Sequence, residues 1–113
     1  MSKVETITLT GKTGVRYQFE VHNMETIFNP IGAIYAFAKK PYYGDPIIHY
    51  IGMTGNLSER FDSHHKLPSA LRAGANCILV HPVFIESARK NTEADLIAYY
   101  KPNLNETLKA FYY

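Results

Sequence analysis

The stretch from residue 47 to residue 64 constrains the fold more than any other part of the chain. Ile47–Gly52 combines β-branched and aromatic residues and predicts a strand. Asn56, followed three residues later by Glu59, is typical of the first turn of a helix, because the two side chains can bond to free backbone amides there. We therefore expect a strand that runs through a short turn into a helix.

Arg60 and His64 should lie on one stripe of this expected helix. They alternate with Leu57 and Phe61 at intervals of three and four residues, so all four side chains share a face. An arginine guanidinium binds phosphate, and a histidine imidazole can transfer a proton near neutral pH. A solvated arginine and a histidine satisfied at a helix end give the same pattern, so the pair alone does not establish a site.

Alternating apolar and polar residues predict further strands on both sides of this stretch. The first two flank the Gly11–Gly14 turn and predict a β-hairpin. Pro82 interrupts the last, which favours an edge strand or a bulge because proline lacks a backbone N–H. Ala33, Tyr35 and Phe37 should share one face of their strand. The predicted strands are 4–10, 15–21, 33–38, 47–52 and 77–85.

A long helix should begin between Ser87 and Asn91 and end before Pro102. Glu93 lies on the apolar stripe of this helix, three residues before Leu96. A carboxylate in such a position is rarely buried unless it is paired or binds a metal. A favourable charge near the helix N-terminus, or an internal ion pair with an arginine, explains Glu93 as well. A magnesium ligand becomes attractive only if a phosphate-binding site lies opposite.

Composition narrows the class of protein. The chain of 113 residues is long enough for a single domain, 1–113, with one modest core. Its single cysteine, Cys77, excludes a disulfide within the chain and indicates a reducing, cytoplasmic compartment. No apolar run is long enough to span a bilayer. The net charge of +2 permits a nucleic-acid partner without requiring one.

Several of these residues, in this order, resemble the GIY-YIG nuclease family. That domain occurs in homing endonucleases, excision-repair incision enzymes and restriction enzymes. The resemblance implies an α+β fold with a central three-stranded antiparallel sheet flanked by helices, over a family core at about 31–105. It places the N-terminal hairpin, 4–21, outside that core as an extension. The matching residues are Ala33-Ile34-Tyr35, Tyr50-Ile51-Gly52, Arg60, His64, Glu93 and Asn105.

The family hydrolyses a DNA phosphodiester bond with one divalent cation, Mg²⁺ or Mn²⁺. By resemblance, Glu93 is the metal ligand and Arg60 offsets the charge that grows on the phosphate. Tyr35 is the first choice, and Tyr50 the second, for the hydroxyl that orients or deprotonates the attacking water. His64 would share that proton or contact the phosphate.

Asn105 matches the asparagine that buttresses the family site, with Asn103 as the near alternative. The chain also departs from the family pattern. Ala33 stands where the first motif usually has glycine, Met53 stands where some members have lysine, and the loop between the two tyrosines is longer than usual. None of these differences removes a residue that the mechanism requires.

The resemblance therefore implies a metal-dependent DNA endonuclease of phage, mobile-element or restriction origin, with DNA as its partner and no membrane association. Two other classes of function stay open. A catalytically inactive GIY-YIG-like module would hold DNA or a protein without cutting, and a structural protein would use Glu93 and the tyrosines only as core partners. Because the domain is small, we expect a homodimer, a larger partner protein or the hairpin at 4–21 to supply specificity.

Overall fold

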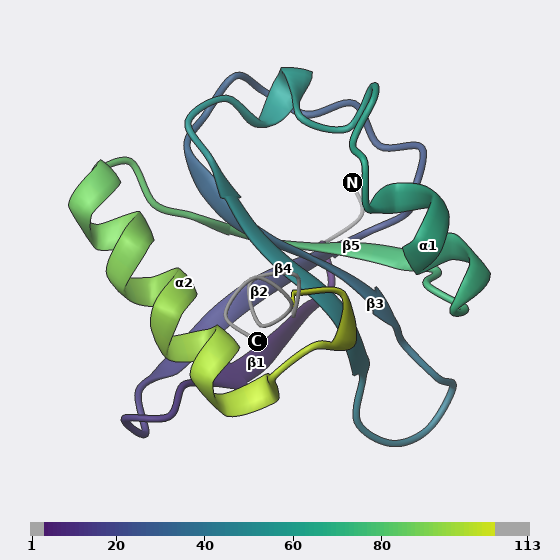
Figure 1. Cartoon of the computed structure of the whole chain (residues 1–113), viewed down its shortest axis with the longest axis horizontal. Helices are drawn as coiled ribbons and strands as arrows, with labels where there is room; N and C mark the ends of the chain where they lie inside the picture. Colours follow the sequence, from purple (N-terminus) through teal and green to yellow (C-terminus); the bar gives the residue numbers. More distant parts are fainter. Residues whose placement is uncertain (1–3, 106–113) are drawn as a thin grey trace, which may run out of the picture.

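A five-stranded antiparallel sheet runs through the centre of the protein, with helices on both of its faces (Figure 1). The computed structural model describes residues 4–105. Within that range, no helix has the length and apolar character needed to cross a bilayer. In chain order the elements are β1 (Thr6–Thr10), β2 (Arg16–His22), β3 (Ala33–Lys39), β4 (Ile47–Thr54), the 3₁₀ turn η1 (Leu57–Glu59), α1 (Leu67–Arg72), β5 (Cys77–Pro82) and α2 (Glu86–Tyr100).

The expected three-stranded sheet, with the N-terminal hairpin outside it, is wrong. The strand order is β1-β2-β5-β3-β4, and β2 pairs antiparallel with β5 over Ile78–Val80. The hairpin cannot bury its apolar face alone, and one side of β5 offers backbone groups that need partners, so the two join into one sheet. β5 is therefore an interior strand, not the expected edge strand. Pro82 is tolerated because it is the last residue of β5, beyond the pairing with β2.

Each face of the sheet carries its own hydrophobic core. Leu96 of α2 packs into the core that contains Ile34. Ala33, Tyr35 and Phe37 face the opposite way, in the core that lies under α1 and η1. The predicted alternation of β3 is therefore confirmed, and β3 is buried on both faces.

The helix expected from Asn56 onward is a single 3₁₀ turn, Leu57–Glu59. Asn56 caps this turn as predicted, because its Oδ1 accepts a hydrogen bond from the backbone N–H of Ser58 at 3.1 Å. The turn does not extend into a helix. Nδ1 of His64 accepts a hydrogen bond from the backbone N–H of Lys66 at 3.0 Å, which is a bond that competes with helical pairing.

Asp95 of α2 holds the turn of the N-terminal hairpin. Its carboxylate accepts hydrogen bonds from the backbone N–H of Thr13 at 2.9 Å, from the Thr13 hydroxyl at 2.8 Å and from the Tyr17 hydroxyl at 2.7 Å. Gly11 permits this approach, because a Cβ atom there would overlap the Asp95 carboxylate. The hairpin is thus bound to α2 as well as to β5.

Replacing Asp95 with alanine should lower the melting temperature by several degrees, because Thr13 and Tyr17 lose their shared acceptor. Circular dichroism melting measures the change. The Tyr17 and Thr13 hydrogen bonds hold the pKa of Asp95 below its usual 3.8. This stabilisation is therefore present above pH 3.8 and is lost as the pH falls through the lowered pKa, so the difference between the proteins should shrink in strong acid.

Asp62→Ala is the matched control for this experiment, since Asp62 is exposed. It should leave the melting temperature unchanged. A melting temperature of Asp95→Ala equal to that of the wild type would show that the hairpin does not depend on this carboxylate.

Candidate active site

The hydroxyl of Tyr35 is the point at which three of the predicted site residues meet. Tyr35 is fully buried on β3, opposite Gly52 of β4. Its oxygen accepts a hydrogen bond from Nε–H of Arg60 at 2.9 Å and lies 2.6 Å from Nε2 of His64. Arg60 and His64 therefore converge on Tyr35, although no continuous helix joins them.

His64 donates its hydrogen bond to Tyr35. Nδ1 of the ring already accepts from the backbone N–H of Lys66, so the neutral ring carries its hydrogen on Nε2. Burial, reinforced by the charge of Arg60, lowers the pKa of His64 from 6.5 to about 4. The imidazole is therefore neutral at pH 7. The Tyr35 oxygen accepts two hydrogen bonds, and its own hydrogen is left for another group.

Tyr50 lies beside this cluster on β4. Its ring centroid is 6.2 Å from that of Tyr35 and 5.2 Å from that of His64. Burial raises the pKa of Tyr50, the positive charge of Arg60 lowers it, and the negative charge of Glu93 raises it. Tyr50 is therefore within electrostatic range of both a cation and an acid.

Glu93, on α2, lies within electrostatic range of Arg60 and Tyr50. The carboxylate is half-buried, and burial raises its pKa while the charge of Arg60 lowers it. Among residues 4–105, Glu93 makes no ion pair or side-chain hydrogen bond. A carboxylate partly removed from water is less stable when charged and without a partner, and a bound cation would offset that cost.

Glu93 therefore fits the expected ligand of a divalent cation. Mg²⁺ prefers oxygen ligands and commonly uses one or two carboxylates together with water and phosphate oxygens. The part of the chain that the structure describes contains no group of three or more His, Cys, Asp or Glu side chains able to hold a metal. Glu93 is thus the acid that the site would offer to such an ion.

Gly52 makes the space that the Tyr35 hydroxyl occupies. The two residues are paired across β3 and β4, and a Cβ atom at position 52 would overlap both the hydroxyl and the ring of Tyr35. The glycine of the Tyr50-Ile51-Gly52 motif is therefore required by the tyrosine opposite it.

Asn105 supports β4 from its outer edge. Its Oδ1 accepts from the backbone N–H of Ile51 at 2.8 Å, and its Nδ2 donates to the Ile51 carbonyl at 2.7 Å. β4 is an edge strand, so these bonds satisfy backbone groups that have no neighbouring strand. Asn103, the near alternative, is exposed. Asn105 therefore fixes the strand segment between Tyr50 and Gly52.

Arg89 is a residue of this region that no sequence motif indicated. It lies one turn before Glu93 on α2, and its Nη1 donates to the carbonyl of Val83 at 2.9 Å. A Cβ atom at Gly32 would overlap this guanidinium, and one at Gly55 would lie 3.6 Å from it. Arg89 thus bonds the helix that carries Glu93 to Val83, and its guanidinium lies beside Gly32 and Gly55, next to the start of β3 and the end of β4. The only signal in the sequence is its four-residue spacing from Glu93.

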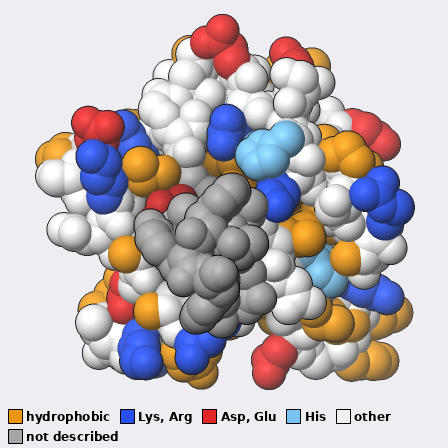
Figure 2. Space-filling model, viewed as in Figure 1, with side chains coloured by type: hydrophobic (Ala, Val, Ile, Leu, Met, Phe, Trp, Pro, Cys, Tyr) orange, Lys and Arg blue, Asp and Glu red, His pale blue; other side chains and the backbone are white. Residues whose placement is uncertain are grey.

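Basic side chains of the segment from η1 to α1 surround the site. Arg60 and Lys66 are partly exposed, and His65 and Arg72 are exposed. Figure 2 shows Lys, Arg and His side chains close together above the centre of the view, on the side of the molecule where η1 lies in Figure 1. A negatively charged ligand would be attracted to such a surface.

No family model, curated protein or solved structure matches the chain. The geometry of Tyr35, Arg60, His64, Tyr50 and Glu93 is therefore the basis for assigning a function.

Gly52→Ala should displace the Tyr35 ring and lower the free energy of unfolding by about 1–3 kcal/mol, the usual cost of adding a methyl group to a packed site. Denaturant unfolding measures the loss. Gly55→Ala is the control, because its Cβ would make an ordinary 3.6 Å contact with Arg89. Equal stability of the two variants would contradict the steric role of Gly52.

The wild-type protein should lose stability as the pH falls from 6.5 to about 4. In that range the unfolded chain binds a proton at His64 and the folded protein does not, so protonation favours unfolding. His64→Gln should flatten this pH dependence, whereas His65→Gln, at an exposed position, should retain it. Denaturant unfolding at several pH values compares the slopes, and an unchanged slope in His64→Gln would contradict a buried neutral imidazole.

Proposed function

We propose that the protein is a metal-dependent DNA endonuclease of the GIY-YIG type. The observation that carries this proposal is the cluster around the Tyr35 hydroxyl, where Arg60 and His64 donate hydrogen bonds and the half-buried Glu93 lies within electrostatic range of Arg60. A small core gains little stability from a cation and an unpaired acid placed together. Phosphodiester hydrolysis uses both groups.

Arg60 is the phosphate-binding group of this proposal. Its Nε is committed to Tyr35, so the two terminal nitrogens of the guanidinium are the ones that would meet phosphate oxygens. Held in this way, the positive charge needs little reorganisation as negative charge grows on the phosphate. Tyr35 is then a positioning residue for Arg60.

Tyr50 is better placed than Tyr35 to orient the attacking water, which reverses the order of preference implied by the family resemblance. Tyr35 is fully buried, its oxygen already accepts two hydrogen bonds, and burial raises its pKa. Tyr50 is partly exposed. Burial raises the pKa of Tyr50, while Arg60 and the Tyr35 hydroxyl lower it. Tyr50 would therefore hold the water, and His64 would keep Tyr35 in place through Nε2–H.

Glu93 would hold the divalent cation with its carboxylate oxygens. When bound, Mg²⁺ would stabilise negative charge on the phosphate and on the leaving oxygen. The lack of a described partner for Glu93 and the desolvation of its carboxylate support this role. Arg89 would keep Glu93 in position, because it anchors the preceding turn of α2 to Val83.

Plasmid nicking tests the proposal. The wild-type protein should nick supercoiled plasmid with Mg²⁺ and not with EDTA, and Glu93→Gln should lower the rate by roughly 100-fold or more. Glu86→Gln, an exposed position in the first turn of the same helix, is the control and should nick normally. Nicking at the wild-type rate by Glu93→Gln would refute the proposed site. DNA binding without any nicking would favour the inactive binding module.

The melting temperature of Glu93→Gln separates a ligand site from a structural one. Because burial raises the pKa of Glu93, its charge destabilises the folded protein at neutral pH, and glutamine should leave the melting temperature unchanged or higher. A fall of many degrees would identify Glu93 as part of a structural ion pair.

A further inference from the structure

Two tyrosines at the tip of the β3–β4 loop are not explained by packing within the domain. Tyr42 is 88% exposed and Tyr43 is 85% exposed. Their rings stack on one another, with centroids 4.7 Å apart and planes 24° apart. The loop projects from the end of the sheet at the lower right of Figure 1. Neighbouring aromatic side chains that stay in water are typical of an interaction surface.

The base of this loop is held in place. Asn76, which follows α1, accepts a hydrogen bond from the backbone N–H of Lys40 at 2.9 Å and donates one to the Lys40 carbonyl at 3.2 Å. The Lys40 ammonium also pairs with Glu5 at 2.8 Å. These contacts limit the positions of the tip, so little entropy is lost when a ligand binds there.

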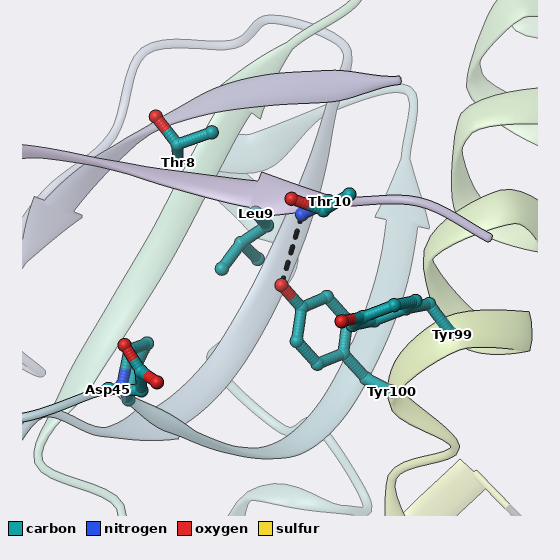
Figure 3. Close-up of a pocket in the computed structure, with 7 residues that line it drawn as sticks. Thr8, Leu9, Thr10, Asp45, Tyr99 and Tyr100 are labelled. Atoms are coloured by element: carbon teal, nitrogen blue, oxygen red, sulfur yellow. Dashed lines mark hydrogen bonds between the residues drawn. The ribbon is translucent and has the colours of Figure 1, made fainter. Parts of the chain in front are cut away.

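Charges on the two sides of the loop differ in sign. Lys39 is exposed, and its side chain passes over Gly74, two residues after Arg72 at the end of α1. Asp45 lies on the other side, where it lines a separate pocket of about 250 Å³ with Tyr99 and Tyr100 (Figure 3). The side of the loop nearest α1 is therefore basic. α1 covers the same sheet face as Tyr35, so this basic side continues towards the proposed active site.

β3 sets the distance between the loop and the catalytic cluster. Tyr35 and Lys39 lie four residues apart on β3, a separation of about 13 Å. Tyr42 lies three residues beyond the end of β3, so even a fully extended chain places it no more than about 23 Å from Tyr35. Stacked DNA, which advances about 3.4 Å per nucleotide along each strand, covers this distance in at most about seven nucleotides.

We propose that Tyr42 and Tyr43 form a stacking platform for unpaired bases of a DNA strand whose phosphate is bound at Arg60. This inference rests on the proposed function. The free ring faces stack on bases without reading their sequence, and Lys39 and Arg72 attract the strand backbone. The platform binds the substrate within about seven nucleotides of the cleaved bond and favours DNA with a single-stranded segment there.

Binding to two single-stranded probes tests the platform. Fluorescence anisotropy in EDTA compares a labelled oligothymidine with an abasic deoxyribose-phosphate oligomer of equal length and charge. Tyr42→Ala combined with Tyr43→Ala should weaken oligothymidine binding by about tenfold or more and leave abasic binding unchanged. The double phenylalanine variant should bind like the wild type. Tyr99→Ala, which removes a 55% exposed tyrosine on α2, is the control.

Each other outcome overturns the platform. Oligothymidine binding that survives in the double alanine variant, or an equal loss with both probes, would show that the tyrosines do not stack on bases. A changed sedimentation coefficient of that variant with unchanged binding would make them a protein contact.

Binding in EDTA is independent of cleavage, so the two proposals fail separately. Tyrosine-dependent oligothymidine binding without plasmid nicking would retain the platform and refute the nuclease. Plasmid nicking, together with unaltered oligothymidine binding in the double alanine variant, would retain the nuclease and refute the platform.

Discussion

The candidate site depends on one buried hydroxyl. Tyr35 lies at the centre of the sheet with no access to water, and a buried phenol needs polar partners. It obtains them from Nε of Arg60 and Nε2 of His64. Gly52 leaves room for the ring, because any side chain there would overlap it. These constraints fix Arg60 and His64 in space although the segment that carries them is largely irregular. Glu93 of α2 lies within electrostatic range of Arg60 and Tyr50, and Arg89 bonds the preceding turn of the same helix to Val83.

The local part of this fold could be predicted from the sequence. Alternation identified the strands, because the pattern of a strand lies in its own residues, and the strong helix signal placed α2 within a few residues of its observed ends. The pairing of β2 with β5 could not be predicted, because the alternation within a hairpin does not identify the strand, distant in sequence, with which it pairs. At Asn56 the cap was right and the helix was wrong, because only the single 3₁₀ turn Leu57–Glu59 forms there.

The candidate site was predicted by resemblance more than by physical derivation. The helical-stripe argument expected Arg60 and His64 to lie together, and they do, but a shared hydrogen-bond acceptor and not a helix face brings them together. The resemblance ranked Tyr35 above Tyr50 by motif order, whereas the proposed mechanism prefers Tyr50 because Tyr35 is fully buried and Tyr50 is partly exposed, a difference that residue type alone does not reveal. Arg89 gave no signal because its partners are a backbone carbonyl and two glycines. The sequence specifies the chemical groups of each side chain, but the burial of those groups depends on the tertiary fold and cannot be read from the sequence.

Glu93 has no ion-pair or side-chain hydrogen-bond partner among residues 4–105 and lies within electrostatic range of Arg60 and Tyr50. The proposed nuclease requires these groups to act on one phosphate and one divalent cation. Anomalous diffraction from a crystal soaked in Mn²⁺ tests this requirement most directly. The account predicts one peak at coordinating distance from the Glu93 carboxylate, on the side that faces Arg60 and Tyr50. Saturating Mn²⁺ with no peak there, and a Glu93 carboxylate hydrogen-bonded to protein groups instead, would contradict it.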